Sequence, residues 1–220
     1  MIDTTNRRSR DADESPERMP SSIPYDALVF DLGGVIVAHD NERLYRRLAE
    51  RCAAADAYQR IVAATQQPGI GTGALPIPAL HRRLIDELGY GLGWEDFVAD
   101  WNCHFTLDAS MLDLVERLAA ANRVMLFSNT NREHWEYLVA TSDGRLGRLE
   151  AYLSYEIGLA KPSLESFRAV AAMAGIDARR ALFVDDLPVN VEAAREVGFH
   201  GEVFVGQQAL EARLAGHPAP

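Results

Sequence analysis

The chain has 220 residues, of which 48% are hydrophobic and 25% charged, which suits one packed domain of ordinary size or a core with a modest insertion. A formal net charge of −10 argues against a general binder of nucleic acid or anionic membranes, and no apolar run approaches the roughly 20 residues needed to cross a bilayer. The beginning of the sequence lacks the apolar stretch of a secretory signal, and two cysteines suit a reducing compartment, so we expect a cytoplasmic protein.

The first 22 residues are polar, charged and nearly free of large apolar side chains. Such a segment buries too little surface to offset the entropy lost on ordering, so we expect a disordered tail. The folded part of the chain is therefore predicted to begin near residue 23.

Short apolar runs then alternate with helical patterns. The predicted strands are Ala27–Asp31, Val124–Ser128, Tyr152–Tyr155, Ala181–Asp185 and Val203–Val205. The predicted helices between and after the later strands lie near residues 109–121, 131–141, 163–174, 189–198 and 207–216. Several strand candidates are almost continuously apolar, as expected when both faces of a sheet are covered. The alternation predicts parallel crossovers and a doubly wound α/β sheet, whose ligands gather at the carboxyl ends of the strands.

The segment between the first two strands has a different character. Residues 40–58 are rich in Ala, Arg and Leu, and the patterns LHRRLIDELG and WEDFVADWNCHF follow with helical spacing. One face of the last pattern is expected to carry Trp94, Phe97, Val98, Trp101 and Phe105. We predict a small all-helical cap at residues 39–106, over a core made of residues 23–38 and 107–220. Trp101 and His104 are candidates to face a substrate, although packing inside the cap explains the aromatic stripe more simply.

Polar residues are predicted where four segments reach the same edge of this sheet. They are Asp31 before the turn Gly33–Gly34, Ser128 with Asn129, Lys161 before a helix expected to open with Pro162, and the pair Asp185 and Asp186. A turn, helix capping by Ser or Asn, and a solvated Lys are the simplest explanations of the first three segments taken singly. The fourth is different, because neighbouring carboxylates repel each other unless a cation lies between them.

Taken together, the segments FDLGGV, SN, KP and VDD resemble the four motifs of the haloacid dehalogenase (HAD) superfamily of aspartate-nucleophile phosphatases. The resemblance covers about residues 25–205 and includes a helical cap between the first two motifs. It implies a Rossmann-like core. Within the superfamily, the segments DLGGVIV and FSNTNREH are most similar to the branch that contains α-D-glucose-1-phosphate phosphatases.

The resemblance also implies a role for each motif residue. Asp31 would attack phosphorus and form an aspartyl-phosphate that water then hydrolyses. The cofactor would be Mg²⁺, held by Asp31, the backbone carbonyl of Gly33 and Asp186, with Asp185 binding directly or through water. The phosphate would be bound by Ser128, by the backbone amides of Asn129 and Gly34, and by the charge of Lys161. The partner would be a small phosphorylated metabolite, and neither nucleic acid nor a membrane is expected.

Gly33 departs from the family pattern, in which the residue two positions after the nucleophile is a second Asp that acts as general acid and base. The metal needs only a backbone carbonyl there, but acid–base assistance, worth about 10²–10⁴-fold in rate, is lost. The main hypothesis is a phosphatase whose leaving group needs little protonation, such as the anomeric oxygen of a sugar 1-phosphate. Asp40 is a candidate substitute acid, although a helix N-cap explains it more simply.

Two alternatives remain open. A 2-haloacid dehalogenase also lacks the second Asp, but it uses no metal, and Asp185 with Asp186 would repel its anionic substrate. A catalytically weak protein that binds a phosphate ligand or regulates a partner is the second alternative. The candidate nucleophile, Lys and metal ligands in the sequence argue against it.

Overall fold

The computed structural model describes residues 23–216. The predicted disordered tail lies outside the described residues. No helix within residues 23–216 is long and apolar enough to cross a membrane.

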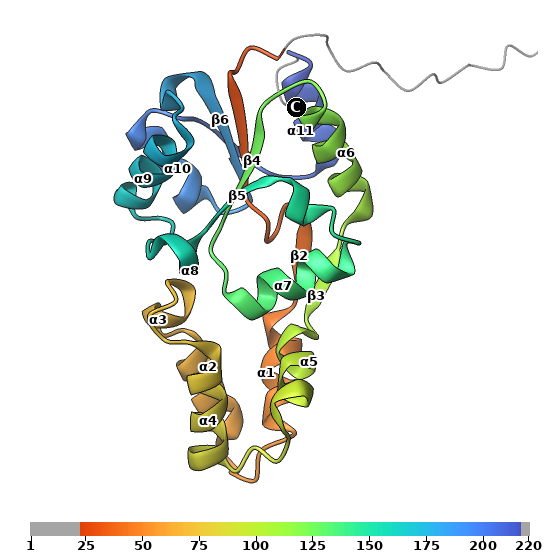
Figure 1. The fold of residues 1–220 in the computed structure, drawn as a ribbon, viewed down its shortest axis with the longest axis vertical. Helices are drawn as coiled ribbons and strands as arrows, with labels where there is room; N and C mark the ends of the chain where they lie inside the picture. Colours follow the sequence, from red (N-terminus) through yellow and green to blue (C-terminus); the bar gives the residue numbers. More distant parts are fainter. Residues whose placement is uncertain (1–22, 217–220) are drawn as a thin grey trace, which may run out of the picture.

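A five-stranded parallel sheet with the order β5-β4-β1-β6-β7 forms the core of the molecule (Figure 1). Its strands are β1 (Ala27–Phe30), β4 (Val124–Ser128), β5 (Glu150–Leu153), β6 (Ala181–Asp185) and β7 (His200–Val203). From β1 the chain moves outward through β4 to β5, then returns to the other side of β1 and continues through β6 to β7. This order is the predicted doubly wound topology, and it creates a switch point between β1 and β6.

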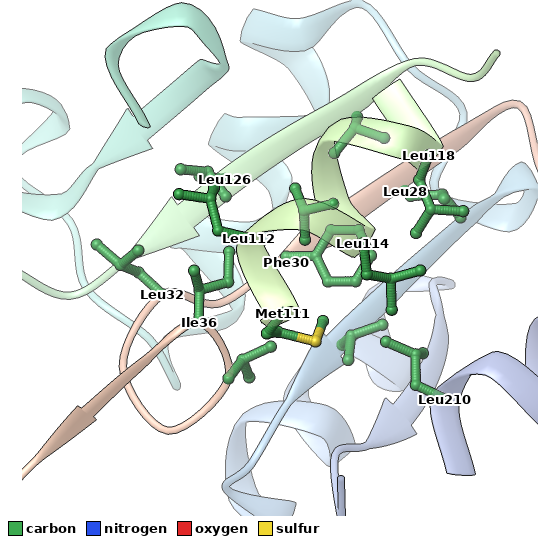
Figure 2. Packing of buried hydrophobic residues seen from close by; sticks show 14 of the residues in the cluster. Leu28, Phe30, Leu32, Ile36, Met111, Leu112, Leu114, Leu118, Leu126 and Leu210 are labelled. Atoms are coloured by element: carbon green, nitrogen blue, oxygen red, sulfur yellow. The ribbon is translucent and has the colours of Figure 1, made fainter. Parts of the chain in front are cut away.

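Helices cover both faces of the sheet. They are α6 (Ala109–Ala119), α7 (Arg132–Thr141), α9 (Leu164–Ala174), α10 (Pro188–Val197) and α11 (Gln207–Leu214), with α8 (Ser154–Ile157) and the 3₁₀ turns Leu146–Arg148 and Ala178–Arg180 in the connections. Alternate residues of β1 point to opposite faces: Leu28 and Phe30 pack with α6 and α11, whereas Val29 packs with α9 and α10. Figure 2 shows Phe30 among Met111 and Leu112 of α6.

The two outer strands lie two to three residues earlier than predicted. The strand expected at residues 152–155 is β5, which ends at Leu153, and the strand expected at 203–205 is β7, which ends at Val203. Both lie at the edges of the sheet, and both begin with polar residues, Glu150 and His200, that are exposed to solvent. The hydrophobic pattern therefore predicted the bounds of these two strands poorly, because only part of an edge strand is buried.

Helices α1–α5, called the cap helices below, lie beyond the carboxyl ends of the strands (Figure 1). They are α1 (Asn41–Ala49), α2 (Ala57–Thr65), α3 (Pro68–Gly71), α4 (Ile77–Leu88) and α5 (Trp94–Asn102), and they enclose an apolar cluster of their own. The segment 40–58, expected to be helical from its composition, is interrupted between α1 and α2. Its middle turns instead, because the backbone amides of Ala53 and Ala54 both donate hydrogen bonds to the Leu88 carbonyl at the end of α4.

A two-stranded antiparallel ribbon, β2 (Val37–His39) with β3 (Phe105–Leu107), joins the cap helices to the core. The sequence did not predict it, since three residues are too few for a recognisable alternation. Phe105 consequently lies in β3 rather than on the predicted helical face. Of that face, Phe97 and Trp101 are buried in α5, while Trp94 is exposed.

Candidate active site

The predicted site residues come together at the carboxyl edge of the sheet. Asp31 directly follows β1, Ser128 is the last residue of β4, and Asp185 is the last residue of β6. Lys161 lies in the loop between α8 and α9. Because β1 lies between β4 and β6, these side chains enter one small region next to the switch point of the sheet.

Lys161 is a buried ammonium group between two carboxylates. Its Nζ lies 2.8 Å from Asp31 Oδ1 and 2.6 Å from Asp185 Oδ2. The Lys161 backbone is fixed to the tip of β4, since its N–H donates to Asn129 Oδ1 at 2.9 Å and its carbonyl accepts from Asn129 Nδ2 at 2.8 Å. The predicted helix start at Pro162 is wrong, because α9 begins at Leu164 with Ser163 as its N-cap. The loop thus presents Lys161 from a turn, closed by a hydrogen bond of 3.1 Å from the Ser163 N–H to the Ala160 carbonyl, rather than from a helix terminus.

Asp185 is completely buried and its oxygens already accept several hydrogen bonds. The Asn190 side chain donates to both oxygens at 3.0 Å, and the Leu187 backbone N–H donates to Oδ1 at 2.9 Å. Asn190 was not predicted to serve the site. Its position in the first turn of α10 lets it fix the Asp185 carboxylate in one orientation.

Three carboxylates form a candidate metal centre. Asp31, Asp185 and Asp186 each offer an oxygen, and these oxygens lie within 4.8 Å of one another. Burial raises the pKa of Asp31 to about 7, with Lys161 opposing this shift and Asp185 adding to it. Burial and the charge of Asp185 also raise the pKa of Asp186. The cluster thus carries more negative charge than Lys161 balances, and its all-oxygen donor set fits a hard divalent cation such as Mg²⁺.

The two glycines of the turn after Asp31 differ in whether a side chain would fit at their positions. Gly34 has φ of 73°, and a Cβ there would lie 2.2 Å from Asp186 Cγ, so only glycine leaves room for that carboxylate. The Gly34 N–H donates to the Val37 carbonyl at 2.8 Å, so it is engaged within the turn rather than open to a phosphate as predicted. At Gly33, by contrast, a Cβ would make an ordinary contact of 3.6 Å with His39 Nδ1.

Ser128 and Asn129 do not cap the helix that follows them. The N-cap of α7 is Asn131, whose Oδ1 accepts a hydrogen bond from the His134 N–H at 3.0 Å. Ser128 and Asn129 instead line a cavity of about 240 Å³, together with Gly33. The β4 tip therefore lies at the wall of a cavity, as a role in binding a ligand requires.

Comparison with known proteins identifies the family. A family model described as haloacid dehalogenase-like hydrolase matches residues 25–198. The chain belongs to this family. A D-ribitol-5-phosphate phosphatase of Bacteroides thetaiotaomicron is 30% identical over 183 residues, which cover 78% of this chain and 88% of that protein.

Solved structures of HAD proteins superpose on the chain. A HAD family enzyme of Bacteroides thetaiotaomicron, in complex with magnesium and inorganic phosphate, is 27% identical, with a TM-score of 0.73, over 83% of this chain and 96% of that one. A dehalogenase in an intermediate complex is 19% identical, with a TM-score of 0.56, over 84% of this chain and 88% of that one, a likeness of fold alone. The predicted HAD membership and parallel α/β core are thus confirmed, and the relatives bear out the predicted phosphatase type and magnesium.

Three histidines of this HAD chain line the same cavity; His104 was a candidate to face a substrate, whereas His39 and His134 were not predicted to serve the site. His39 ends β2, His104 precedes β3, and His134 lies in the first turn of α7. No shared sequence motif connects the three. Asp40, the candidate substitute acid, is the N-cap of α1, where its Oδ1 accepts from the Arg43 N–H at 3.1 Å.

Proposed function

We propose that the chain is a Mg²⁺-dependent phosphatase that hydrolyses a small phosphate monoester through an aspartyl-phosphate on Asp31. The observation that carries this proposal is the contact between Asp31 and the buried Lys161 inside a cluster of three carboxylates. Such a cluster concentrates a nucleophile, a fixed positive charge and metal ligands at one point, which is what phosphoryl transfer requires. The family membership and the phosphatase relative support it.

Each residue has a distinct part in the proposed reaction. Asp31 is the nucleophile, and Lys161 holds one of its oxygens in place while balancing charge that builds up on the phosphoryl group. Ser128 donates a hydrogen bond to a phosphoryl oxygen from the end of β4. Asp31, the Gly33 carbonyl and Asp186 would hold Mg²⁺, with Asp185 assisting from its buried position. When bound, Mg²⁺ would supply further positive charge to stabilise the phosphoryl group during transfer.

The substrate class follows from the missing acid at Gly33. Asp40 is engaged as a helix cap, and among the described residues no Asp or Glu lines the cavity beside Gly33 to replace the usual second Asp. A sugar 1-phosphate, with its better leaving group, tolerates this loss. A sugar-alcohol phosphate is the second candidate, because a relative acts on D-ribitol 5-phosphate by its name. The net charge of −10 favours a small metabolite over nucleic acid, and we retain a cytoplasmic enzyme without a membrane partner as part of the proposal.

A substrate panel tests this function. The protein is incubated with α-D-glucose 1-phosphate, D-ribitol 5-phosphate and p-nitrophenyl phosphate, in Mg²⁺ and in EDTA. We expect phosphate release that requires Mg²⁺. Halide release from 2-chloropropionate that EDTA does not affect would favour a dehalogenase instead. A thermal shift with sugar phosphates but no turnover of any ester would indicate a phosphate-binding protein.

The substitution Gly33→Asp tests the account of the missing acid. A side chain fits at this position, since its Cβ would contact only the His39 ring. We expect the new carboxyl to accelerate hydrolysis of D-ribitol 5-phosphate by about 10-fold or more, because general acid catalysis helps poor leaving groups most. Hydrolysis of p-nitrophenyl phosphate should change much less. Equal effects on both esters would contradict the explanation.

A further inference from the structure

The loop after the candidate nucleophile folds back so that His39, the last residue of β2, lies beside the glycine turn. Backbone hydrogen bonds close this loop. The Ile36 and Val37 N–H groups both donate to the Leu32 carbonyl at 2.9 Å, and the Gly34 N–H donates to the Val37 carbonyl at 2.8 Å. Pairing of β2 with β3 then fixes the course of the chain at His39. The position of this histidine is therefore determined by the same turn that follows the nucleophile.

The His39 ring borders the space in which the second Asp of the family pattern would lie. A Cβ at Gly33 would be 3.6 Å from His39 Nδ1 and 3.7 Å from its Cε1. Apart from the neighbours of Gly33 in the chain, no other atom of the described residues would lie within 4 Å of that Cβ. An aspartate carboxyl would extend from the Cβ by one further bond, within reach of the ring. His39 Nδ1 is thus the polar atom nearest to the position of the missing acid.

His39 is open to a ligand. It is exposed, and it lines the cavity of about 240 Å³ together with Gly33 and Ser128. The other two histidines of this cavity each have a hydrogen bond with the Trp101 backbone. Because Gly33 and Ser128 belong to both the cavity and the candidate site, the group that leaves a bound phosphate lies along the wall that contains His39.

The His39 ring is also free to donate a hydrogen bond. Within residues 23–216 its nitrogens have no hydrogen-bond partner, so no neighbour fixes the ring proton on Nε2. A histidine ring carries an N–H group in either charge state, and an unconstrained neutral ring can place it on Nδ1. An N–H donor is therefore available beside Gly33 without any change in the protein.

His39 does not belong to the candidate metal centre. Among the described residues, the ligand atoms of that group come from Asp31, Asp185 and Asp186 and lie within 4.8 Å of one another. The ring is still close enough to act on the cluster: burial and the charge of Asp185 raise the pKa of Asp186, and His39 is a smaller influence that opposes the rise. His39 thus lies near the reacting groups but outside the donor set of the metal.

We propose that His39 is a catalytic residue whose ring N–H donates a hydrogen bond to the leaving-group oxygen, in place of the second Asp that Gly33 lacks. The proposal rests on the phosphatase function proposed above and adds the group that assists departure. In this step an Asp31 oxygen forms a bond to phosphorus while the bond from phosphorus to the leaving oxygen breaks. The electron pair of the broken bond stays on that oxygen. The ring N–H stabilises its charge until the oxygen takes a proton from a water molecule, which is left as hydroxide.

Two esters of similar shape test this role. Phenyl phosphate and p-nitrophenyl phosphate differ mainly in the basicity of the oxygen that leaves, and kcat/KM in Mg²⁺ is measured for both with the wild type and His39→Ala. We expect a fall of about 10²-fold on phenyl phosphate, and also on D-ribitol 5-phosphate, because one donor to developing negative charge is lost. The p-nitrophenyl ester should change by less than about 3-fold, since its leaving oxygen needs little assistance.

Matched variants separate the hydrogen bond from other effects of the substitution. His39→Asn places an amide N–H near the position of Nδ1 and should recover part of the rate on phenyl phosphate. His39→Gln reaches toward the position of Nε2 instead and should recover less. His200→Ala removes another exposed histidine, whose Nε2 lies 2.9 Å from the Arg179 carbonyl at the amino end of β7, and it should leave the rates on both aryl esters unchanged.

The substitution Gly33→Asp should offset the loss of His39 if both side chains assist the same oxygen. Combined with His39→Ala, it should raise kcat/KM on phenyl phosphate by a larger factor than it does in the wild type, because effects of residues that serve one group are not additive. An equal factor in both backgrounds would show that the two positions act independently and would contradict the role of His39.

The outcomes distinguish the role of His39 from the function itself. Equal losses on the phenyl and p-nitrophenyl esters, or no loss on either, would overturn the role of His39. Turnover of p-nitrophenyl phosphate that requires Mg²⁺ and Asp31 would in that case still support the phosphatase. Absence of phosphate release from every ester by the wild type would contradict the proposed function and the role of His39 with it.

Discussion

Lys161 Nζ lies 2.8 Å from Asp31 Oδ1, and the Lys161 side chain is only 1% exposed. A buried ammonium group is costly unless carboxylates surround it, and here Asp185 supplies the second one. Lys161 and Asp31 therefore depend on each other electrostatically, because removing either side chain leaves a buried charge without its partner.

The substitution Lys161→Met tests this interdependence. We expect kcat/KM to fall by about 10³-fold or more, because a fixed positive charge near the phosphoryl group is lost. The free energy of unfolding should fall by about 3–5 kcal/mol, as measured when one partner of a buried ion pair is removed. Urea unfolding and steady-state kinetics measure the two effects. Lys161→Arg, which retains the charge, should be less destabilised, and wild-type activity in Lys161→Met would contradict the proposed role.

The two neighbouring glycines should respond differently to alanine. Gly34→Ala forces a side chain into a left-handed backbone conformation and against Asp186, so we expect kcat/KM to fall by about 10²-fold or more. Gly33→Ala should change it by less than about 3-fold, because its Cβ meets only the His39 ring at an ordinary distance. Kinetic assays of both variants at saturating Mg²⁺ make the comparison. A similar fall in kcat/KM in both variants would contradict the view that Gly34 is needed to leave space for the Asp186 side chain.

The core strands were predicted well because their burial is complete. The limits of Val124–Ser128 and Ala181–Asp185 agree with β4 and β6, each of which is covered on both faces. The convergence of Asp31 with Asp185 also followed from the sequence, since parallel strands place their carboxyl ends at one edge. Edge strands and the short β2–β3 ribbon carry too little apolar pattern to be found in this way.

The histidine cluster could not be predicted for a different reason. His39, His104 and His134 belong to three segments that are distant in the sequence, and the β2–β3 pairing and the contact of Trp101 with His134 bring them together. These are tertiary contacts with no local signal. The role of Asn190 was missed similarly, because its value to the site depends on two hydrogen bonds to Asp185 that only the folded chain reveals.

Binding of Mg²⁺ should depend on pH through Asp31. In the metal-free protein the pKa of Asp31 is raised to about 7, mainly by burial, so a cation binding there at lower pH must displace a proton. The apparent affinity for Mg²⁺ should therefore rise by up to about 10-fold per pH unit between pH 5 and 7 and level off above pH 7. Isothermal titration in several buffers measures both the affinity and the proton release. An affinity independent of pH across this range would contradict the assignment, and Asp186→Asn should weaken binding throughout.

Protein stability should fall in mild acid because of His104. Its pKa is about 4 in the folded state, owing first to burial, against 6.5 as the reference value. The contribution of the neutral His104 ring to the free energy of unfolding is fully present above pH 6.5. This contribution is lost as the pH falls from 6.5 toward 4, because in that range the histidine binds a proton in the unfolded chain but not in the folded protein. We expect His104 to account for about 2–3 kcal/mol of this loss, so urea unfolding of His104→Asn should show a flatter pH dependence. Parallel curves for both proteins would exclude a neutral buried His104.

The central claim, that Asp31 is the nucleophile of a Mg²⁺-dependent phosphatase, is tested most directly by measuring phosphate release from D-ribitol 5-phosphate and α-D-glucose 1-phosphate by the wild type and Asp31→Asn in Mg²⁺. The amide has nearly the same shape as the carboxylate but does not act as the nucleophile. We predict turnover by the wild type that EDTA removes, and a loss of at least about 10³-fold in a folded Asp31→Asn. Phosphate release by Asp31→Asn at the wild-type rate would contradict the claim.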